Sequence, residues 1–459
     1  MKISFLGAAK AVTGSCHKVE CNGKAVLLDC GLHQGHRDEA DRLNRFFSFE
    51  PSRIDSVLVS HAHIDHSGNL PTLAKKGFRG KIIATRATVD LLNVMLKDSA
   101  HIQKRDIEYV NKKRKRKGLP PKDILYTQDD VEQALGMMEG VDYGASVSLG
   151  GGVSAEFFDA GHILGSAVIR IDDGKRTLTF TGDLGRKGMP ILRDPYQVDD
   201  TDLLITESTY GNRLHDMANE TEEKLAGIIR ESVRRKGKMI VPAFSVGRTQ
   251  ALVYDLHSLF LENKIPEIAM FVDSPLSVNV TEVFKRHPEC YDAEIKEMLH
   301  SDGNPFGFGK LKYVSNVEES RELNHVDYPC VIISASGMCE AGRILHHLKN
   351  SITDKRNTVL IVGYQARGTL GRRLVEKEKV VRIFGEEYKR RCRIEILNGY
   401  SAHADKRELS EYITNMNVTK NIFCVHGEEN VAEEFAESLR ESNDCDVHVP
   451  DLGDNFELN

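Results

Sequence analysis

Hydrophobic and polar residues follow two different patterns along the chain, and each pattern predicts a different kind of structure. Over roughly the first two hundred residues, short apolar runs end in turns that contain glycine, as at 3–6, 16–21 and 25–29. Short runs of this kind are typical of β-strands joined by tight turns. A β-rich first part is therefore expected, interrupted by helices at 68–76 and further along the chain.

The pattern changes near residue 210, where longer segments with a helical repeat alternate with short apolar runs. Helices are expected at 219–236, 247–262, 276–287 and 341–349. Strands separated by helices of this length predict βαβ units and a mostly parallel sheet.

Two other stretches complete this assignment. The segment 301–327 follows neither pattern and is expected to be a loop, whereas the last part of the chain returns to the first pattern. There, strands before His403 and His426 precede a helix near 430–441 and a last strand at 445–449.

The composition is that of a globular chain with more than one hydrophobic core. The chain has 459 residues, 40% hydrophobic and 28% charged, with a net charge of −6 at pH 7. This acidic total gives no support to a nucleic-acid partner, but docking depends on the local field rather than on net charge. The nine cysteines form no CxxC pair, which favours reduced thiols. Neither a signal peptide nor a membrane-spanning run is recognised, so we expect a cytoplasmic protein without membrane association.

One charge run is prominent. Helices are predicted at 87–98 and 100–117, and the second ends in six consecutive cationic residues, 112–117. Cations at a helix C-terminus favour the helix dipole, so a solvated helix end is one interpretation. The other is an arm that attracts phosphate groups beside an active site.

Four side chains that can bind metal lie within six residues, directly after the apolar run 57–59. They are His61, His63, Asp65 and His66. The alternate residues His61 and His63 can point at one metal ion, and the turn after them carries Asp65 and His66 toward a second position. Two metal ions about 3.5–4 Å apart can clamp both sides of an in-line displacement. An isolated histidine is usually structural, but this spacing after a strand predicts a metal site.

Further histidines and acidic residues follow predicted strands later in the chain. His162 follows an alternating strand, Asp183 follows the run 178–180, and His403 and His426 each end a strand in the last part. Each of these motifs alone is weak, since such residues are common in turns.

Three turns of small residues also follow predicted strands, at 242–248, 334–338 and 363–369. In a parallel sheet the loops at the carboxyl ends of strands gather at one edge and precede helix N-termini, where backbone N–H groups can hold phosphate. Arg248 and Arg343 can add bidentate contacts. Each turn alone is ordinary loop chemistry, but three on one predicted edge favour phosphate binding.

Taken together, these motifs resemble the β-CASP branch of the metallo-β-lactamase superfamily, whose members are nucleic-acid-processing nucleases. The likeness rests on HAHIDH at 61–66, Glu207 after a strand, SAHAD around His403 and VHGE around His426, and it begins with GAAKAVTGSCH at 7–17. It covers essentially the whole chain and is closest to the short prokaryotic ribonucleases.

This resemblance implies an α/β fold with two parts. An αββα metallo-β-lactamase sandwich would contain residues 1–208 and 396–459. A β-CASP α/β domain of mostly parallel sheet would be inserted between them, at 209–395.

The resemblance also implies a set of ligands for two metal ions. His61, His63 and His162 would bind one ion, and Asp65, His66 and His426 the other, with Asp183 between them. Imidazole and carboxylate ligands suit zinc, with manganese as the alternative.

Four residues receive other roles in the site. Asp29 would hydrogen-bond a histidine ligand and fix its tautomer. Asp65 would also accept a proton from water. His403 would protonate the leaving oxygen, held charged by Glu207, the alternative being a structural histidine.

The implied activity is that of a metal-dependent ribonuclease. It would cut single-stranded RNA internally, with or without 5′–3′ exonuclease activity, to give 5′-phosphate and 3′-hydroxyl ends. The expected phosphate contacts are Thr13, Gly14, Ser15, Ser245, Arg248, Ser334, Ser336, Gly337 and Arg343. The resemblance also makes a homodimer plausible. The alternatives are a hydrolase of another phosphodiester or of a thioester, and a non-catalytic RNA-binding subunit.

Overall fold

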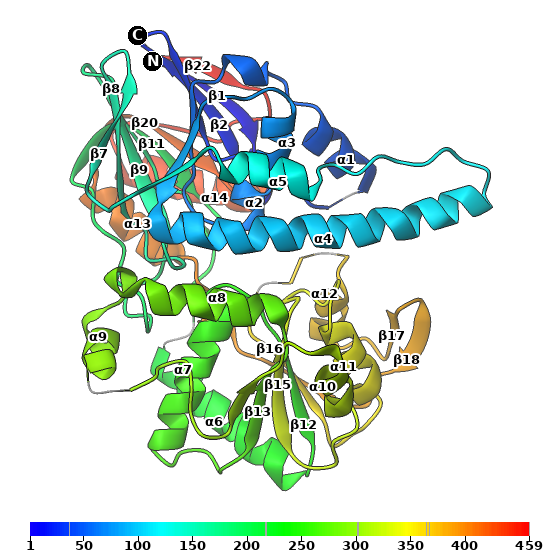
Figure 1. Cartoon of the computed structure of the whole chain (residues 1–459). Coiled ribbons are helices and arrows are strands. Elements are labelled where there is room, and N and C mark those ends of the chain that lie inside the picture. The colour runs from blue at the N-terminus through cyan, green and yellow to red at the C-terminus, as the bar shows by residue number, and fades with distance from the viewer. Residues whose placement is uncertain (36, 216–217, 301–302, 364, 367, 459) are drawn as a thin grey trace. The chain divides into compact units, whose positions relative to one another are not determined.

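The computed structural model describes residues 1–35, 37–215, 218–300, 303–363, 365–366 and 368–458 (Figure 1). The chain forms two compact units. Unit 1 consists of Met1–Lys187, Asp194–Leu214 and His403–Asn459, and unit 2 consists of Gly188–Arg193 and His215–Ala402. The domain limits expected from the sequence stay a prediction.

The first sheet of unit 1 has seven strands in the order β22-β1-β2-β3-β4-β5-β6. Neighbours from β22 to β3 are antiparallel, and neighbours from β3 to β6 are parallel. Their bounds are β1 Lys2–Gly7, β2 Cys16–Cys21, β3 Lys24–Leu28, β4 Ser56–Leu58, β5 Lys81–Thr85, β6 Met138–Val141 and β22 Asn455–Glu457.

The second sheet of unit 1 also has seven strands, in the order β21-β20-β11-β10-β9-β8-β7. Neighbours from β21 to β10 are parallel, and neighbours from β10 to β7 are antiparallel. The bounds are β7 Ser146–Gly150, β8 Val153–Asp159, β9 Ala167–Asp172, β10 Thr177–Phe180, β11 Asp200–Glu207, β20 Asn417–Val425 and β21 Asp446–His448.

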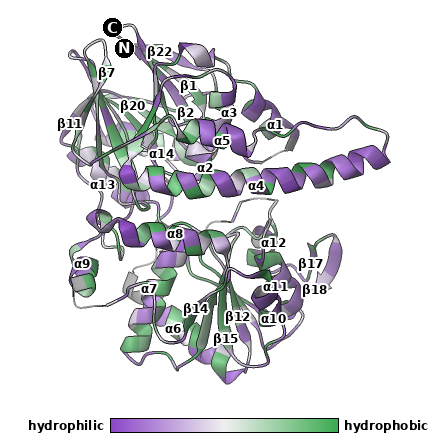
Figure 2. Ribbon diagram, in the orientation of Figure 1, coloured by the Kyte–Doolittle hydropathy of each residue, from purple (hydrophilic) through white to green (hydrophobic). Residues whose placement is uncertain are grey.

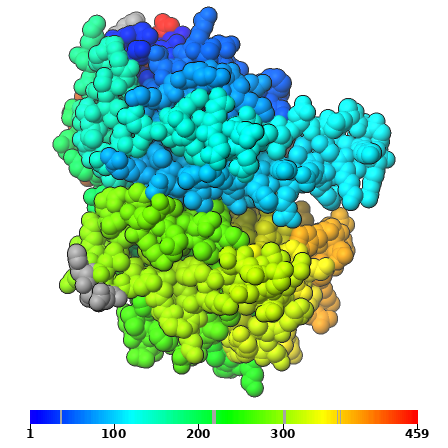
Figure 3. Space-filling model, in the orientation of Figure 1, coloured from blue at the N-terminus to red at the C-terminus, as the bar shows by residue number. Residues whose placement is uncertain are grey.

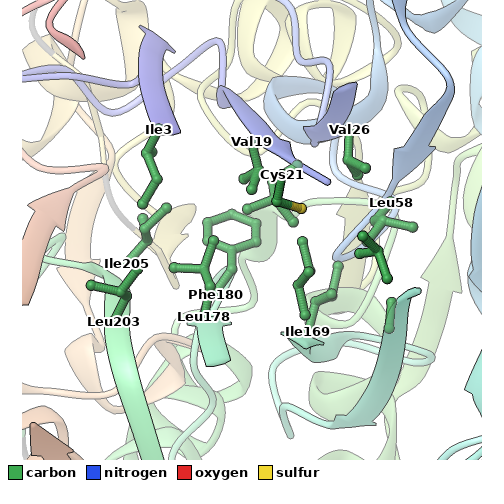
Figure 4. Packing of buried hydrophobic residues seen from close by; sticks show 14 of the residues in the cluster. Ile3, Val19, Cys21, Val26, Leu58, Ile169, Leu178, Phe180, Leu203 and Ile205 are labelled. Carbon is green, nitrogen blue, oxygen red and sulfur yellow. The ribbon is translucent and has the colours of Figure 1, made fainter. Parts of the chain in front are cut away.

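The core of unit 1 lies between these two sheets. Figure 4 shows side chains of the first sheet, such as Val19 and Leu58, facing Phe180 and Leu203 of the second. Successive side chains along a strand point to opposite faces of the sheet. Phe423 of β20 therefore enters this core, while Ile422 and Cys424 pack in a cluster with helices on the outer face.

Helices cover the outer faces of the sandwich. On the first sheet they are α1 Arg37–Arg45, α2 Ile64–Ser67, α3 Leu70–Lys75, α4 Arg86–Arg116 and α5 Gln128–Leu135, and on the second α13 Lys406–Asn415 and α14 Glu429–Ser442. The two sheets and the two helical layers confirm the expected αββα sandwich.

Unit 2 contains a six-stranded sheet in the order β14-β13-β15-β12-β16-β19, in which every pair is parallel. Separate apolar clusters cover its two faces, so the strands are buried on both sides, and Figure 2 shows them as largely hydrophobic. The mostly parallel inserted sheet expected from the sequence is confirmed.

The strands of this sheet are β12 Lys238–Pro242, β13 Ala269–Val272, β14 Leu311–Tyr313, β15 Cys330–Ser334, β16 Thr358–Ile361 and β19 Arg393–Ile396, and a separate hairpin is formed by β17 Val380–Ile383 and β18 Glu386–Lys389. The helices are α6 Ala218–Arg234, α7 Arg248–Leu261, α8 Pro275–Arg286, α9 Ala293–His300, α10 Val317–Leu323, α11 Ile344–Ser351 and α12 Leu370–Val375.

Some sequence predictions are wrong in detail. Two helices are expected at 87–98 and 100–117, but the structure has one continuous helix, α4, that runs through Ser99. The segment 301–327 contains β14 and α10 rather than only loop, and β22 was missed because so short a strand has no distinct pattern.

Two further features concern the cysteines and the helices. All nine cysteines are free. Among the described residues, no helix is both long enough and apolar enough to cross a membrane.

A buried carboxyl group anchors the last segment of unit 2. The hydroxyl of Tyr400, in the 3-10 turn Asn398–Tyr400, donates a hydrogen bond to Asp255 Oδ2 at 2.5 Å. Burial raises the pKa of Asp255 to about 7, although the Tyr400 hydrogen bond and the charge of Arg248 act in the opposite direction. Asp255 therefore takes up a proton on folding at mildly acidic pH.

This uptake predicts a pH-dependent stability. Because the folded pKa lies above the value of about 3.9 for an unfolded aspartate, the stabilisation is lost as pH rises toward 7, by at most about 1.4 kcal/mol per pH unit. Asp255→Asn keeps an acceptor for Tyr400 and cannot ionise, so it should gain stability over the wild type as pH rises. We would compare the urea unfolding midpoints of the wild type and of Asp255→Asn at about pH 5 and about pH 8. A difference between the two proteins that is independent of pH would contradict the prediction, and exposed Asp327→Asn is the control.

Candidate metal centre and active site

The candidate site lies at the carboxyl ends of strands in unit 1. Asp29 directly follows β3, and the histidine loop follows β4, which is parallel to β3. Asp183, Glu207 and His426 come at the ends of β10, β11 and β20, which are parallel to one another. Parallel strands end at the same edge of a sheet, so residues far apart in sequence meet there.

The first group of candidate ligands consists of His61, His63, His162 and Asp183, whose ligand atoms all lie within 4.8 Å of one another. The Nδ1 atom of His63 lies 3.0 Å from His61 Nε2 and 3.3 Å from His162 Nε2. Asp183 Oδ2 is 3.5 Å from the Nε2 atoms of both His61 and His162.

The second group consists of Asp65, His66 and His426. The two Nε2 atoms of His66 and His426 are 3.1 Å apart, and Asp65 Oδ2 lies 3.7 Å from His426 Nε2. The other oxygen of Asp183, Oδ1, is 3.3 Å from His66 Nε2 and 3.6 Å from His426 Nδ1. Asp183 thus contacts both groups, one with each oxygen.

These residues fit metal ions. Ring nitrogens about 3 Å apart can share only one proton, whereas a cation can satisfy their lone pairs together. Asp183 Oδ1 is buried and has no hydrogen-bond donor among the described residues. Burial also lowers the pKa of His61 well below its ordinary value and that of His63 to about 4, which favours the neutral ligand form.

The carboxylates in the site are held ionised. Burial alone would raise the pKa of Asp65, but the His426 hydrogen bond and the charge of His66 lower it to about 2. For Asp183, the effect of burial is likewise outweighed by the neighbouring histidines, with His426 and His66 the strongest, so its pKa falls well below the ordinary value. An ionised carboxylate is the form that binds a metal cation.

Asp29 contacts one of the candidate ligands directly. Its Oδ2 atom is 2.7 Å from His66 Nδ1, and it also accepts hydrogen bonds from the hydroxyl groups of Ser15 and Ser60. The backbone N–H of Ser60 donates to Oδ1. This arrangement fixes the ring of His66 with Nε2 toward Asp183 and His426.

His403 and Glu207 form a pair beside the two groups. His403 Nδ1 lies 3.1 Å from Glu207 Oε2 and 3.8 Å from Asp183 Oδ2. Burial lowers the pKa of His403, but the carboxylates of Glu207 and Asp183 outweigh it and raise the value to about 9. Glu207 is fully buried and also accepts from the backbone N–H of Leu184 at 2.6 Å.

One functional contact has no counterpart in the sequence predictions. The Thr209 hydroxyl lies 3.2 Å from His426 Nδ1 and donates to the backbone oxygen of His426. Its place two residues after Glu207 is the only signal in the sequence, and that signal is too weak to identify it.

The expected phosphate-binding residues have varied surroundings. The turns after β15, β12 and β16 follow adjacent parallel strands, and Gln365 donates to the backbone oxygen of Gly337, so two of the three turns are in contact. Tyr364 and Arg367 of the third turn lie outside the described residues.

Several of these residues have partners within the chain. Ser15 donates its backbone N–H to the backbone oxygen of Asp65 and its hydroxyl to the carboxylate of Asp29. Ser334 donates to the backbone of Asp273, and Arg343 pairs with the Asp273 carboxylate at 2.6 Å. Gly14 and Gly337 are buried, with the rings of His33 and Phe244 where a side chain would lie. Thr13 likewise exchanges hydrogen bonds with the backbone of Gln34. The phosphate contacts expected at all nine residues stay predictions.

Comparison with protein families agrees with this geometry. The family model of the metallo-beta-lactamase superfamily matches residues 11–243, and the Beta-Casp domain matches 249–374. The Zn-dependent metallo-hydrolase RNA specificity domain matches residues 387–450. The chain therefore belongs to the metallo-β-lactamase superfamily, and within it to the branch that carries a β-CASP domain.

Individual relatives extend over nearly the whole chain. Ribonuclease TTHA0252 of Thermus thermophilus is 36% identical over 429 residues, covering 94% of each protein. The RNase J-like protein of Methanocaldococcus jannaschii is 30% identical, covering 98% of each protein. Transcription termination factor FttA of the same organism is 30% identical over 98% of this chain and 70% of its own length.

One solved structure shares the fold. A protein of unknown function from Enterococcus faecalis V583 aligns with a TM-score of 0.55 and 14% identity, over 100% of this chain and 99% of its own. At this identity the likeness concerns the fold alone.

Close backbone packing positions the two ligand loops, and this predicts the effect of a small substitution. A Cβ atom on Gly31 would lie 1.7 Å from the backbone oxygen of Asp65. Gly31→Ala should therefore displace the loop with Asp65 and His66 and weaken metal binding by about tenfold or more. Metal content after dialysis against a metal buffer would measure this, with circular dichroism to check folding.

The matched control for this prediction is Gly227→Ala. Gly227 lies in α6, and nothing within 4 Å would meet its Cβ atom. Both substitutions add one methyl group, so full metal binding by folded Gly31→Ala would contradict the packing argument.

Proposed function

We propose that this protein is a metal-dependent ribonuclease that cuts single-stranded RNA internally, with or without 5′–3′ exonuclease activity. The observation that carries the proposal is the position of Asp183, which contacts both groups of ligands while His403 lies beside the same carboxylate. The ribonuclease named among the relatives supports RNA as the substrate.

The proposed cofactors are two zinc ions, with manganese as the alternative. His61, His63 and His162 would hold one ion, and Asp65, His66 and His426 the other, with Asp183 shared. When bound, such ions supply Lewis acidity toward the phosphodiester and toward water. Sets of imidazole and carboxylate ligands are those that proteins offer to zinc.

The side chains would then move the two protons of the reaction. Water attacks the phosphorus atom, and Asp65 accepts the proton that the water loses. The bond from phosphorus to the 3′ oxygen breaks, and His403, held by Glu207, gives that oxygen a proton. The products are a 5′-phosphate and a 3′-hydroxyl end.

Other parts of the proposal concern positioning and context. Asp29 would orient His66. The residues that would contact phosphates of the RNA are Thr13, Gly14, Ser15, Ser245, Arg248, Ser334, Ser336, Gly337 and Arg343. A homodimer stays a prediction from the family resemblance, and a cytoplasmic location stays a prediction from the sequence.

The first test is cleavage of a long single-stranded RNA labelled at both ends. Wild-type protein should cut it internally, chelation should abolish cutting, and added Zn²⁺ should restore it. Asp65→Ala and His403→Ala should each lower the rate by about 10²–10⁴-fold, the usual size of a general acid–base contribution or more. His325→Ala, at an exposed histidine, is the matched control and should not change the rate. Cutting that survives chelation, or hydrolysis of a small thioester without cutting of RNA, would contradict the proposal.

A modified substrate separates the role of His403 from that of Asp65. A sulfur atom in place of the bridging 3′ oxygen leaves without needing a proton, so this substrate should largely restore the rate of His403→Ala. The same substrate should not restore Asp65→Ala. Equal rescue of both variants, or of neither, would refute His403 as the acid that protonates the leaving oxygen.

A further inference from the structure

The outer half of α4 and the segment that follows it form a strongly basic surface, which we call the basic arm (residues 104–122). The arm contains nine lysines and arginines and two acidic residues, a net charge of +7. Since the whole chain has a net charge of −6, the other residues together carry −13. The positive charge is therefore concentrated in one small part of an acidic protein.

The arm is connected directly to the candidate active site. The hydroxyl groups of Thr85 and Thr88, at the start of α4, both donate to the backbone oxygen of Gly165. Gly165 belongs to the loop that carries His162, so one end of the helix is fixed beside the ligands. The 31 residues of α4 then extend about 45 Å toward the arm.

The base of the arm is held firmly. Asn111 and Lys122 exchange two hydrogen bonds, at 2.8 and 2.9 Å, and the ammonium group of Lys122 donates to Asp41 of α1. Arg45 donates to the backbone oxygen of Asp123. Beyond these contacts the tip extends past the other helices of unit 1, as the cyan segment in Figures 1 and 3 shows.

Seven of the nine basic residues of the arm are exposed and, in the part of the chain that the structure describes, lack acidic partners. Among the described residues, no ion pair involves the lysines or arginines at 104, 105, 112, 113, 115, 116 or 117, and all seven side chains are exposed. Figure 2 shows this part of α4 as strongly hydrophilic. Neighbouring cations repel one another, so the arrangement costs stability unless a polyanion neutralises it.

An exposed aromatic ring lies among these cations. Tyr109 is 60% exposed, and the ammonium group of Lys113 lies 4.4 Å from its ring centroid. Basic residues with an interspersed aromatic ring are the combination that holds single-stranded nucleic acid, because bases stack on the ring while phosphates meet the cations.

We propose that the basic arm binds the RNA substrate at a distance from the bond that is cut. At about 3.4 Å per nucleotide, the length of α4 corresponds to on the order of ten nucleotides. The arm therefore makes the enzyme select long single strands over short fragments. This inference rests on the proposed ribonuclease function, and the observations favour RNA over an acidic protein because of the exposed ring at Tyr109.

Binding to RNA without cleavage tests the arm by itself. The probe is a fluorescent single-stranded RNA of about 30 nucleotides, titrated in the presence of a chelator. Substitution of Lys112, Lys113, Lys115 and Lys117 by Gln should weaken binding by at least about tenfold near 0.1 M salt. It should also reduce the slope of log K against log salt by about 3, since each phosphate contact on a single strand contributes about 0.7.

The control variant loses the same number of positive charges at a different place in the protein. Lys264, Lys285, Lys310 and Lys312 are exposed lysines of unit 2, and their substitution by Gln should leave both quantities nearly unchanged. Equal weakening by both sets, or unchanged binding with the arm variant, would overturn the proposal and leave an acidic protein as the partner of the arm.

Tyr109 provides a more conservative test. Tyr109→Phe keeps the ring and should bind like the wild type, whereas Tyr109→Ala should weaken binding by about fivefold or more. Loss of affinity in Tyr109→Phe equal to that in Tyr109→Ala would contradict stacking on the ring.

Cleavage assays separate this proposal from the proposed function. The arm variant should cut a long RNA with a raised KM and an unchanged kcat, and it should cut an RNA of about six nucleotides like the wild type. A KM of the arm variant on the long RNA equal to that of the wild type would overturn the role of the arm. A wild-type protein that binds RNA through the arm but never cuts it would contradict the ribonuclease function and not the arm.

Discussion

The shared carboxylate of Asp183 is the contact on which the rest of the site depends. It is buried at the end of β10, and its two oxygens face different groups of histidines. An ionised group in such a place needs compensating positive charge, which protonated histidines can supply only in part because their nitrogens lie so close together. Two cations would satisfy the carboxylate and the imidazoles at once.

The sandwich of unit 1 serves this requirement. The loops after the parallel strands β4, β10 and β20 carry most of the ligands, and His162 follows β8, so ligands from residues 61 to 426 converge. Backbone contacts at glycine, such as Gly31 against Asp65, set the spacing of the loops. Asp29, Ser60 and Thr209 then fix individual rings, and Glu207 fixes His403.

Much of this could be predicted from the sequence, because strand ends and metal-binding side chains leave local signals. The histidine loop, the parallel insert and the likeness of the late motifs to the β-CASP branch are all visible in short stretches. Contacts that depend on tertiary packing are not. No local signal in the sequence shows that Ser15 bonds to Asp29 or that Arg343 pairs with Asp273. The continuity of α4 through Ser99 depends likewise on packing, with the Ser99 hydroxyl 2.7 Å from that of Tyr126.

The most direct test of the central claim is a crystal structure of zinc-loaded protein, with anomalous scattering measured on both sides of the zinc absorption edge. The account predicts two peaks about 3.5–4 Å apart, one in each group of ligands and both in contact with Asp183. A single peak, or peaks that do not contact Asp183, would contradict the shared-carboxylate metal centre from which the proposed chemistry follows.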